Sequence, residues 1–322
     1  MVRAIGIGEI AVDLRRTGLW FVAIIALWAL VYLFNSGAWR LILRGRREVS
    51  FPKIFQICVA GFALNNLTPL VGVGGEPYRV MVLKESVGAR DSLSAVVLYW
   101  MLHFLSSFVF WIFAIIIVML TINLPVDLRV VFAVTLLGSL FGTWFMLSRH
   151  MKGMFGTVFK VAQGFSFLKR ITEKMGLTEK SMALLDDRIK GLYRSRKPDF
   201  YWALLLEVVA RVAASIEFIL ILKAIGIEIG LYEALYLGAG YYLFVDAFFF
   251  IPLQLGAREG GLYLLTGAIG IASGVGVFMA LVMRIRELFW TLLGLLLIHV
   301  GGVPAKRQPI PDLLRGEDID VK

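Results

Sequence analysis

Five apolar runs of 20 or more residues limit this chain to a small set of folds. They cover residues 19–39, 93–122, 128–147, 200–225 and 274–300. A helix of about 20 apolar residues crosses the roughly 30 Å hydrocarbon core of a bilayer. Of the 322 residues 59% are hydrophobic and 17% are charged, whereas soluble domains have about a quarter charged residues. The sequence therefore predicts an all-α polytopic integral membrane protein with about five full spans.

The connections between these runs predict the orientation of the chain, because basic loops stay in the cytoplasm. Residues 148–198 hold twelve Lys or Arg and four acidic residues, whereas 123–127 and 226–232 hold no Lys or Arg. We expect 148–198 to be cytoplasmic and amphipathic and to lie on the anionic inner leaflet, with a solvated connector as the alternative. The tail 301–322 contains the basic pair Lys306 and Arg307 and is expected in the cytoplasm. The chain is thus predicted to be a multi-pass protein of the plasma (inner) membrane.

The side of the N-terminus is the weakest point of this topology. The number of spans places the N-terminus outside, but Arg3, Arg15 and Arg16 favour the cytoplasm. The sequence therefore allows either side of the membrane for the N-terminus.

The charge and the metal-binding residue types exclude several kinds of partner. A net charge of +10 suggests nucleic acid in a soluble protein, but here the basic residues separate membrane runs and no base-reading module accompanies them. We expect no nucleic-acid partner. Cys58 is the single cysteine, so no internal disulfide forms, and the three histidines have no Cys or His at ligand spacing. We expect no metal and no cofactor.

Two further apolar regions are too short to cross a bilayer. Residues 54–90 lie between two cytoplasmic ends, and their first arm, 54–67, would span about 21 Å as a helix. Residues 233–272 lie between two external ends. Each region therefore predicts a re-entrant helical hairpin, and the two hairpins are expected to enter from opposite faces.

The tips of both predicted hairpins carry the same pattern. Pro69 and Pro252 are each followed by Leu, and each precedes a glutamate, Glu76 or Glu259, by seven residues. Proline ends the incoming half-helix, glycines permit the reversal, and the next helix begins near the glutamate. Its free N–H groups could receive an anionic headgroup, although a glutamate there can also be an ordinary helix cap.

This pattern predicts an inverted repeat inside a single membrane domain of residues 1–300. The first repeat covers about 40–147, the basic segment 148–198 follows, and the second repeat covers about 199–300. Transporters commonly build a midplane substrate site from such repeats with broken helices.

Ionisable residues inside the apolar runs are costly and therefore informative. Glu207 and Arg211 are four residues apart on one run and can pair on one helix face. Such groups could line a polar route for a lipid headgroup, or they could be ion pairs that hold helices together. We favour the structural role for Glu217 and Asp246.

Two other polar residues in these runs have simpler interpretations. Arg286 is expected to extend towards the cytoplasmic interface. His103 is expected to be a hydrogen-bonded packing residue rather than a proton shuttle.

The predicted translocation site combines the two hairpin tips with these intramembrane charges, and no catalytic residue is expected. Its members are Asn66, Pro69, Glu76, Arg79, Glu207, Arg211, Pro252, Arg258, Glu259 and Arg284.

Two motifs carry a family resemblance. The first, in the order Asn66-x-Thr-Pro-x5-Gly-Glu-x2-Arg79, and the second, Pro252-x3-Gly-x-Arg-Glu259, are followed by Arg284. Together they resemble the lysylphosphatidylglycerol synthase transmembrane, or flippase-like, family over about residues 15–300. The resemblance implies a membrane domain that moves lipids between leaflets.

The resemblance does not extend to the synthase activity. The best known members flip aminoacylated phosphatidylglycerol made by a fused cytosolic synthase, but only about 22 residues follow residue 300 here. Aminoacyl transfer is therefore not implied. Related stand-alone members are associated with hopanoid or lipid-linked sugar pathways.

The leading functional hypothesis is a flippase or transporter of a polar or anionic phospholipid or glycolipid, without enzymatic activity. The alternatives are a membrane-embedded lipid-modifying enzyme and a scaffold for a lipid-modifying complex. No Asp-x-x-Asp, His-x-x-x-Asp or Ser/His/Asp set supports the enzyme. No nucleotide-binding motif is present, so transport is expected to be downhill or ion-coupled. The lipid, the direction and a homo-oligomeric state are left open.

Overall fold

The computed structural model describes residues 18–44, 49–68, 74–149, 196–248 and 251–301, with a few isolated positions between 163 and 191. The elements within these five ranges are helices, which confirms the predicted all-α class. In chain order they are α2 (Gly18–Leu43), α3 (Phe51–Leu67), α4 (Gly75–Val87), α5 (Ala89–Thr121), α6 (Val126–Arg149), α10 (Lys197–Ala224), α11 (Leu231–Ala247), the 3₁₀ turn η1 (Pro252–Gln254), α12 (Ala257–Ala268) and α13 (Ser273–Gly301).

Several long helices are suited to cross a membrane. Gly18–Leu43, Asp91–Thr121 and Val126–Ser148 are both long and apolar enough. Helices α10 and α13 have 28 and 29 residues, which is also sufficient length at about 1.5 Å per residue, but they carry charged residues in their interiors. The chain is a membrane protein, and its total of five spans remains a prediction.

The same order of elements occurs twice in the described chain. A long helix, a 17-residue helix, a short helix and a second long helix follow one another in α2–α5 and again in α10–α13. The short helices α4 and α12 have 13 and 12 residues. In each half a glycine with left-handed backbone, Gly88 at φ 84° and Gly270 at φ 79°, separates the short helix from the long one. Only glycine takes this conformation without steric strain.

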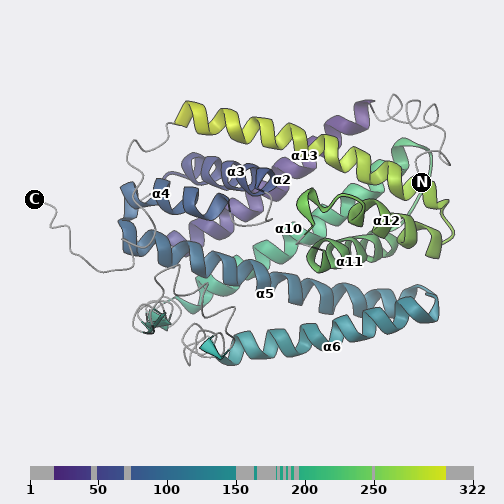
Figure 1. The fold of residues 1–322 in the computed structure, drawn as a ribbon, viewed down its shortest axis with the longest axis horizontal. Coiled ribbons are helices and arrows are strands. Elements are labelled where there is room, and N and C mark those ends of the chain that lie inside the picture. The colour runs from purple at the N-terminus through teal and green to yellow at the C-terminus, as the bar shows by residue number, and fades with distance from the viewer. Residues whose placement is uncertain are drawn as a thin grey trace, which may run out of the picture.

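The two halves are arranged around each other. Helix α2 packs along α10, while α13 packs on α3 and α5 packs on α11, so each half covers the hairpin of the other. Figure 1 shows the α3–α4 pair towards one end of the bundle and the α11–α12 pair towards the other. The inverted relation of the two halves remains a prediction. The entry of the two hairpins from opposite membrane faces remains a prediction.

Both short helices lie unusually close to a neighbouring helix because a glycine faces it. A Cβ on Gly75 of α4 would lie 2.1 Å from the Gly61 carbonyl oxygen of α3. A Cβ on Gly276 of α13 would lie 2.3 Å from the Leu262 carbonyl oxygen of α12. The Asn65 side-chain oxygen also accepts a hydrogen bond from the Gly75 N–H at 2.6 Å, which joins α3 to the start of α4.

Helix ends predicted to share the cytoplasmic side lie near one another. Arg44, after α2, forms an ion pair of 3.1 Å with Asp199 at the start of α10. The Gln56 side chain of α3 donates to the Leu297 carbonyl near the end of α13 at 2.6 Å. The first hairpin tip at 69–73, most of 148–198 and the tail beyond residue 301 lie outside the described residues. The predictions made for these segments therefore remain predictions.

Candidate functional site

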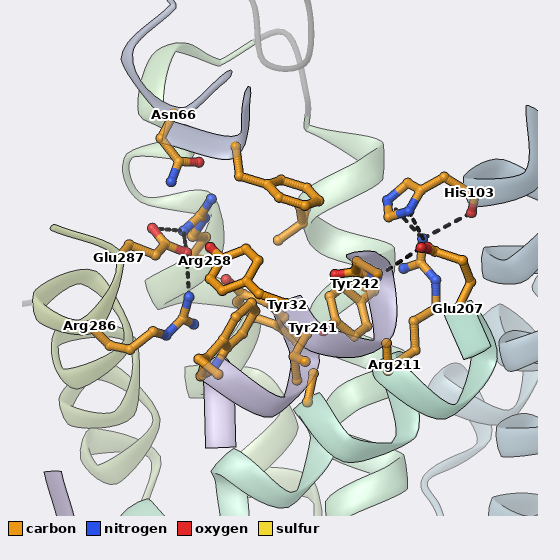
Figure 2. Close-up of a pocket in the computed structure, with 17 residues that line it drawn as sticks. Tyr32, Asn66, His103, Glu207, Arg211, Tyr241, Tyr242, Arg258, Arg286 and Glu287 are labelled. Carbon is orange, nitrogen blue, oxygen red and sulfur yellow. Dashed lines mark hydrogen bonds and ion pairs between the residues drawn. The ribbon is translucent and has the colours of Figure 1, made fainter. Parts of the chain in front are cut away.

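A cavity of about 220 Å³ lies between the two halves of the bundle. Its lining comes from α2, α3, α5, α10, α11, α12 and α13. Four residues of the predicted site, Asn66, Glu207, Arg211 and Arg258, line it. Figure 2 shows one charged cluster on each side of the cavity, with tyrosine rings between them.

The first cluster is built around Glu207, whose carboxylate is fully buried. Its Oε1 accepts hydrogen bonds from Asn35 Nδ2 at 2.9 Å and from the Tyr99 hydroxyl at 2.8 Å. Its Oε2 lies 2.7 Å from His103 Nδ1. A buried carboxylate is strongly destabilising unless such partners satisfy it. Helices α2, α5 and α10 therefore hold this charge together.

Arg211 is the cation of the same cluster, one turn along α10. Its Nη2 lies 3.1 Å from His103 Nε2 and donates to the His103 carbonyl at 3.0 Å, and its Nε donates to Ser106 Oγ at 3.0 Å. The expected direct pair with Glu207 is wrong, because the His103 ring stands between the two charges. Among the described residues, no carboxylate lies within ion-pair distance of Arg211.

The second cluster joins η1, α12 and α13. Arg258 Nη1 lies 2.6 Å from both carboxylate oxygens of Glu287, and Arg258 Nε donates to Gln254 Oε1 at 2.6 Å. Arg286, the neighbour of Glu287, forms two hydrogen bonds of 3.0 Å with the Glu217 carboxylate of α10. The cations on this side of the cavity are thus neutralised.

The expectation that Arg286 extends to the cytoplasmic interface is wrong. Its side chain is 3% exposed, and its guanidinium carbon lies 3.7 Å from the centre of the Trp28 ring. Glu217 supplies the buried countercharge that keeps Arg286 in the interior. This geometry agrees with the structural role favoured for Glu217.

Two ion pairs between residues of the predicted site lie outside the cavity lining. Glu259 Oε1 binds Arg284 Nε at 2.6 Å, and Glu259 Oε2 accepts the Gly256 N–H at 2.9 Å. Glu259 therefore also caps α12, which is the ordinary structural role considered for it. Glu76 Oε1 binds Arg79 Nη1 at 2.7 Å near the start of α4.

Arg79 itself is buried in an unusual way. Its side chain is 3% exposed and its guanidinium lies over the rings of Trp39, Phe62 and Tyr99. Its Nε and Nη2 have no hydrogen-bond partner in the described part of the chain.

Of the two prolines of the predicted site, the structure describes only Pro252. Pro69 lies outside the described residues. Pro252 begins η1, where the next two residues, Leu253 and Gln254, have left-handed φ of 53° and 52°. Such values are uncommon outside glycine and mark a constrained turn. Gln254 is buried there and donates to the Val245 carbonyl at 2.9 Å.

Sequence reasoning missed several residues of the cavity. Asn35 and Glu287 line it and each bind a charged member of the site, and Tyr99, outside the lining, binds Glu207. A lone asparagine inside an apolar run was the available signal for Asn35. Within the described residues, no group of three or more His, Cys, Asp or Glu is placed to hold a metal ion.

Comparisons with known proteins add one finding. Residues 1–294 match the family described as the lysylphosphatidylglycerol synthase TM region. The matched residues include the cavity, α2 to α12 and most of α13. No curated protein and no solved structure gave a significant match.

Proposed function

Because the chain belongs to the lysylphosphatidylglycerol synthase TM region family, whose members are lipid-associated membrane proteins, we propose that it moves a lipid between bilayer leaflets. The headgroup passes through the central cavity while the acyl chains stay in the bilayer. The cavity of about 220 Å³ is smaller than the roughly 300–1,000 Å³ pockets that enclose drug-sized ligands. It therefore suits a headgroup better than a whole lipid.

The observation that carries the proposal is the state of Arg211. It is a guanidinium in the cavity wall whose partners are an imidazole, a hydroxyl and a carbonyl rather than a carboxylate. A cation without a direct ion pair inside a membrane protein favours an anionic ligand. The planar guanidinium fork matches the geometry of a phosphate group. We therefore assign the headgroup phosphate to Arg211.

The opposite wall explains why a bound headgroup can leave again. Arg258 and Arg286 carry two positive charges, and Glu287 and Glu217 neutralise them at 2.6 and 3.0 Å. A site that conducts its ligand must bind it strongly enough for entry and weakly enough for exit. Arg211, which has no direct carboxylate partner among the described residues, faces a neutral polar wall and so meets both conditions.

The aromatic side chains between the clusters suit the same ligand. Tyr242 lies beneath Arg211, with the guanidinium carbon 5.6 Å from its ring centre, and Tyr241 lies 6.0 Å from the Arg258 guanidinium. Such rings hold the guanidinium groups in place without neutralising them. They also give the apolar part of a headgroup a surface to contact.

The test is lipid movement by purified protein in liposomes that hold headgroup-labelled lipids. Loss of outer-leaflet label to a membrane-impermeant quencher is followed for wild type, Arg211→Gln, Arg211→Lys and Arg44→Gln. Arg44 is the control because its side chain is 69% exposed at a helix end. We expect Arg211→Gln to lower the rate at least about tenfold, equivalent to about 1.4 kcal/mol, and Arg211→Lys to keep part of it.

Two outcomes contradict the proposal. Equal rates for wild type and Arg211→Gln would remove Arg211 from the path. Absence of movement for anionic, zwitterionic and glycosylated lipids would favour a lipid-modifying enzyme or a scaffold. Thermal unfolding of each variant in detergent shows whether a lower rate reflects a lost fold.

A further inference from the structure

The His103 ring connects the buried Glu207 carboxylate to the Arg211 guanidinium in the cavity wall. Its Nδ1 lies 2.7 Å from Glu207 Oε2, and its Nε2 lies 3.1 Å from Arg211 Nη2. Glu207 is fully buried, whereas the His103 side chain is 34% exposed and lines the cavity. The ring stacks on Tyr99 at 6.0 Å between centres. His103 is thus held in place and is also open to water from the cavity.

The partners of His103 determine which ring nitrogen carries hydrogen. A guanidinium has only donors, so the contact with Arg211 Nη2 requires a lone pair on His103 Nε2. The hydrogen of a neutral imidazole must then be on Nδ1, where it is donated to Glu207 Oε2. The observed geometry therefore describes a neutral histidine.

One additional proton on this ring would change the partners of Arg211. A proton on Nε2 would place an imidazolium N–H against a guanidinium N–H at the present 3.1 Å. Neither group could accept from the other, and their charges would repel. Glu207 would remain next to the imidazolium through Nδ1. The repulsion would therefore displace Arg211 rather than the histidine.

We infer that His103 is a proton-binding site that controls Arg211, so that headgroup binding and proton binding favour each other. The inference rests on the proposed function. A proton from water in the cavity binds Nε2, the hydrogen bond from Arg211 Nη2 to that nitrogen breaks, and Nη2 becomes available to the headgroup phosphate. Reversal releases the lipid and the proton together.

The other charged groups around the His103 ring are compatible with proton binding by this residue. On α10, Glu207 favours the imidazolium and Arg211 opposes it. On α11, the exposed Asp246 carboxylate interacts electrostatically with both His103 and Arg211. On α4, the Arg79 guanidinium lies 5.8 Å from the Tyr99 ring, behind the ring that stacks on His103.

The remaining described helices around His103 place no charged side chain next to its ring. On α2, Asn35 contacts Glu207 rather than His103, and on α3 the Phe62 ring lies 6.4 Å from the imidazole centre. On α6, the charged residues Asp127, Arg129 and Arg149 lie within the first or last turn of the helix.

This coupling gives the transporter a source of direction. Thermodynamic linkage requires that a headgroup which favours protonated His103 also takes up a proton when it binds. A pH difference across the membrane would then favour loading on the acidic side and release on the other. The His103–Arg211 contact thus makes the proposed transport ion-coupled rather than downhill.

The experiment measures proton uptake when a short-chain anionic lipid binds the purified protein. Dioctanoyl phosphatidylglycerol is titrated into the protein in detergent by calorimetry, in buffers of different ionisation enthalpy, between about pH 5 and 8, where histidine changes charge. Its phosphodiester keeps one negative charge in this range. Glycerol 3-phosphate serves as the soluble anion without acyl chains, to separate headgroup recognition from lipid recognition.

Three proteins are compared. His103→Gln keeps an amide donor for Glu207 and an acceptor for Arg211, but it cannot take up a proton. His299→Gln, exposed in the last turn of α13, is the matched control. Wild type and His299→Gln are expected to bind the lipid with uptake approaching one proton, and affinity should rise up to about tenfold per unit fall in pH. His103→Gln should bind with no uptake and no pH dependence.

The outcomes separate the inference from the function on which it rests. Lipid binding by wild type without proton uptake, or uptake that His103→Gln retains, overturns the inference and leaves the headgroup site intact. Absence of binding at every pH overturns the proposed function and the inference with it. If His103→Gln does not fold, ¹⁵N-histidine NMR of wild type decides, because lipid should convert the neutral His103 ring into imidazolium.

Discussion

Arg286 and Glu217 face each other in the interior of the bundle as a doubly hydrogen-bonded ion pair. Arg286 Nε and Nη2 lie 3.0 Å from the two carboxylate oxygens, and the side chains are 3% and 1% exposed. The pair joins α13 to α10, the last and first long helices of the second half. It holds one wall of the cavity against the other.

Glu217→Gln is expected to destabilise the protein, because the change leaves the Arg286 guanidinium buried without its countercharge. Removal of one partner from a buried ion pair costs about 3–5 kcal/mol. The thermal midpoint of the protein in detergent should fall clearly. Glu228→Gln, in the exposed connection before α11, should leave it unchanged. Adding Arg286→Met to Glu217→Gln should restore part of the lost stability. A thermal midpoint of the single variant Glu217→Gln equal to that of wild type would show that the pair contributes nothing to stability.

Gly75→Ala is expected to disturb the first hairpin. The new Cβ would lie 2.1 Å from the Gly61 carbonyl oxygen, so α3 and α4 would have to separate. Overpacking of this kind costs about 1–3 kcal/mol. The matched control is Gly138→Ala in α6, where the added carbon would meet nothing within 4 Å. Thermal unfolding should place Gly75→Ala below wild type and Gly138→Ala at or above it, and equal midpoints would contradict the close packing of α3 on α4.

The order of helices and the two hairpins could be predicted because local chemistry determines them. Apolar length predicted the long helices, and Glu76 and Glu259 predicted where the short helices begin, since α4 begins at Gly75 and α12 at Ala257. Gly88 and Gly270 follow α4 and α12 with nearly equal left-handed φ. The predicted first arm began at residue 54, whereas α3 begins at Phe51, since Pro52 fits the first turn of a helix.

The partners of the charged residues could not be predicted from spacing along one helix. Glu207 and Arg211 are correctly spaced to pair, but His103 of α5 lies between them. Arg284 and Glu287 are also suitably spaced, but each binds a residue at the start of α12 instead. In each case a residue on a neighbouring helix lies closer to the charged group than the residue on its own helix does. Only the packing of the bundle reveals which residue that is.

The predicted orientation can be tested by cysteine labelling. The single cysteine, Cys58, is buried, so Cys58→Ala provides a background without thiols. Glu228→Cys lies in a connection predicted to be external, and Glu85→Cys lies near the end of α4, on the predicted cytoplasmic side; both positions are exposed. In intact cells a membrane-impermeant maleimide should label Glu228→Cys and not Glu85→Cys, and lysis should make both reactive. The reverse pattern would invert the topology.

Glu287→Gln is expected to make the cavity wall positive, because Arg258 loses its carboxylate partner and Arg286 loses the farther of its two carboxylate partners, at 3.7 Å. Anionic lipid should bind up to about tenfold more tightly, or about 1.4 kcal/mol, while transport slows because release becomes harder. Calorimetry and the liposome assay measure the two quantities on one preparation, with Glu228→Gln as the control. Unchanged affinity would show that the neutral wall has no part in release.

The double change Arg79→Met with Glu76→Gln separates stability from transport at the first hairpin. The two unpartnered guanidinium nitrogens of Arg79 disfavour the folded state by about 1–3 kcal/mol. Methionine removes that penalty but also loses the contacts with the rings of Trp39, Phe62 and Tyr99, at about 2 kcal/mol. The thermal midpoint should therefore stay within a few degrees of wild type, while lipid movement in liposomes falls, because the predicted route includes both residues. Transport at the wild-type rate would remove Glu76 and Arg79 from the route and leave the cavity around Arg211 as the whole of the site.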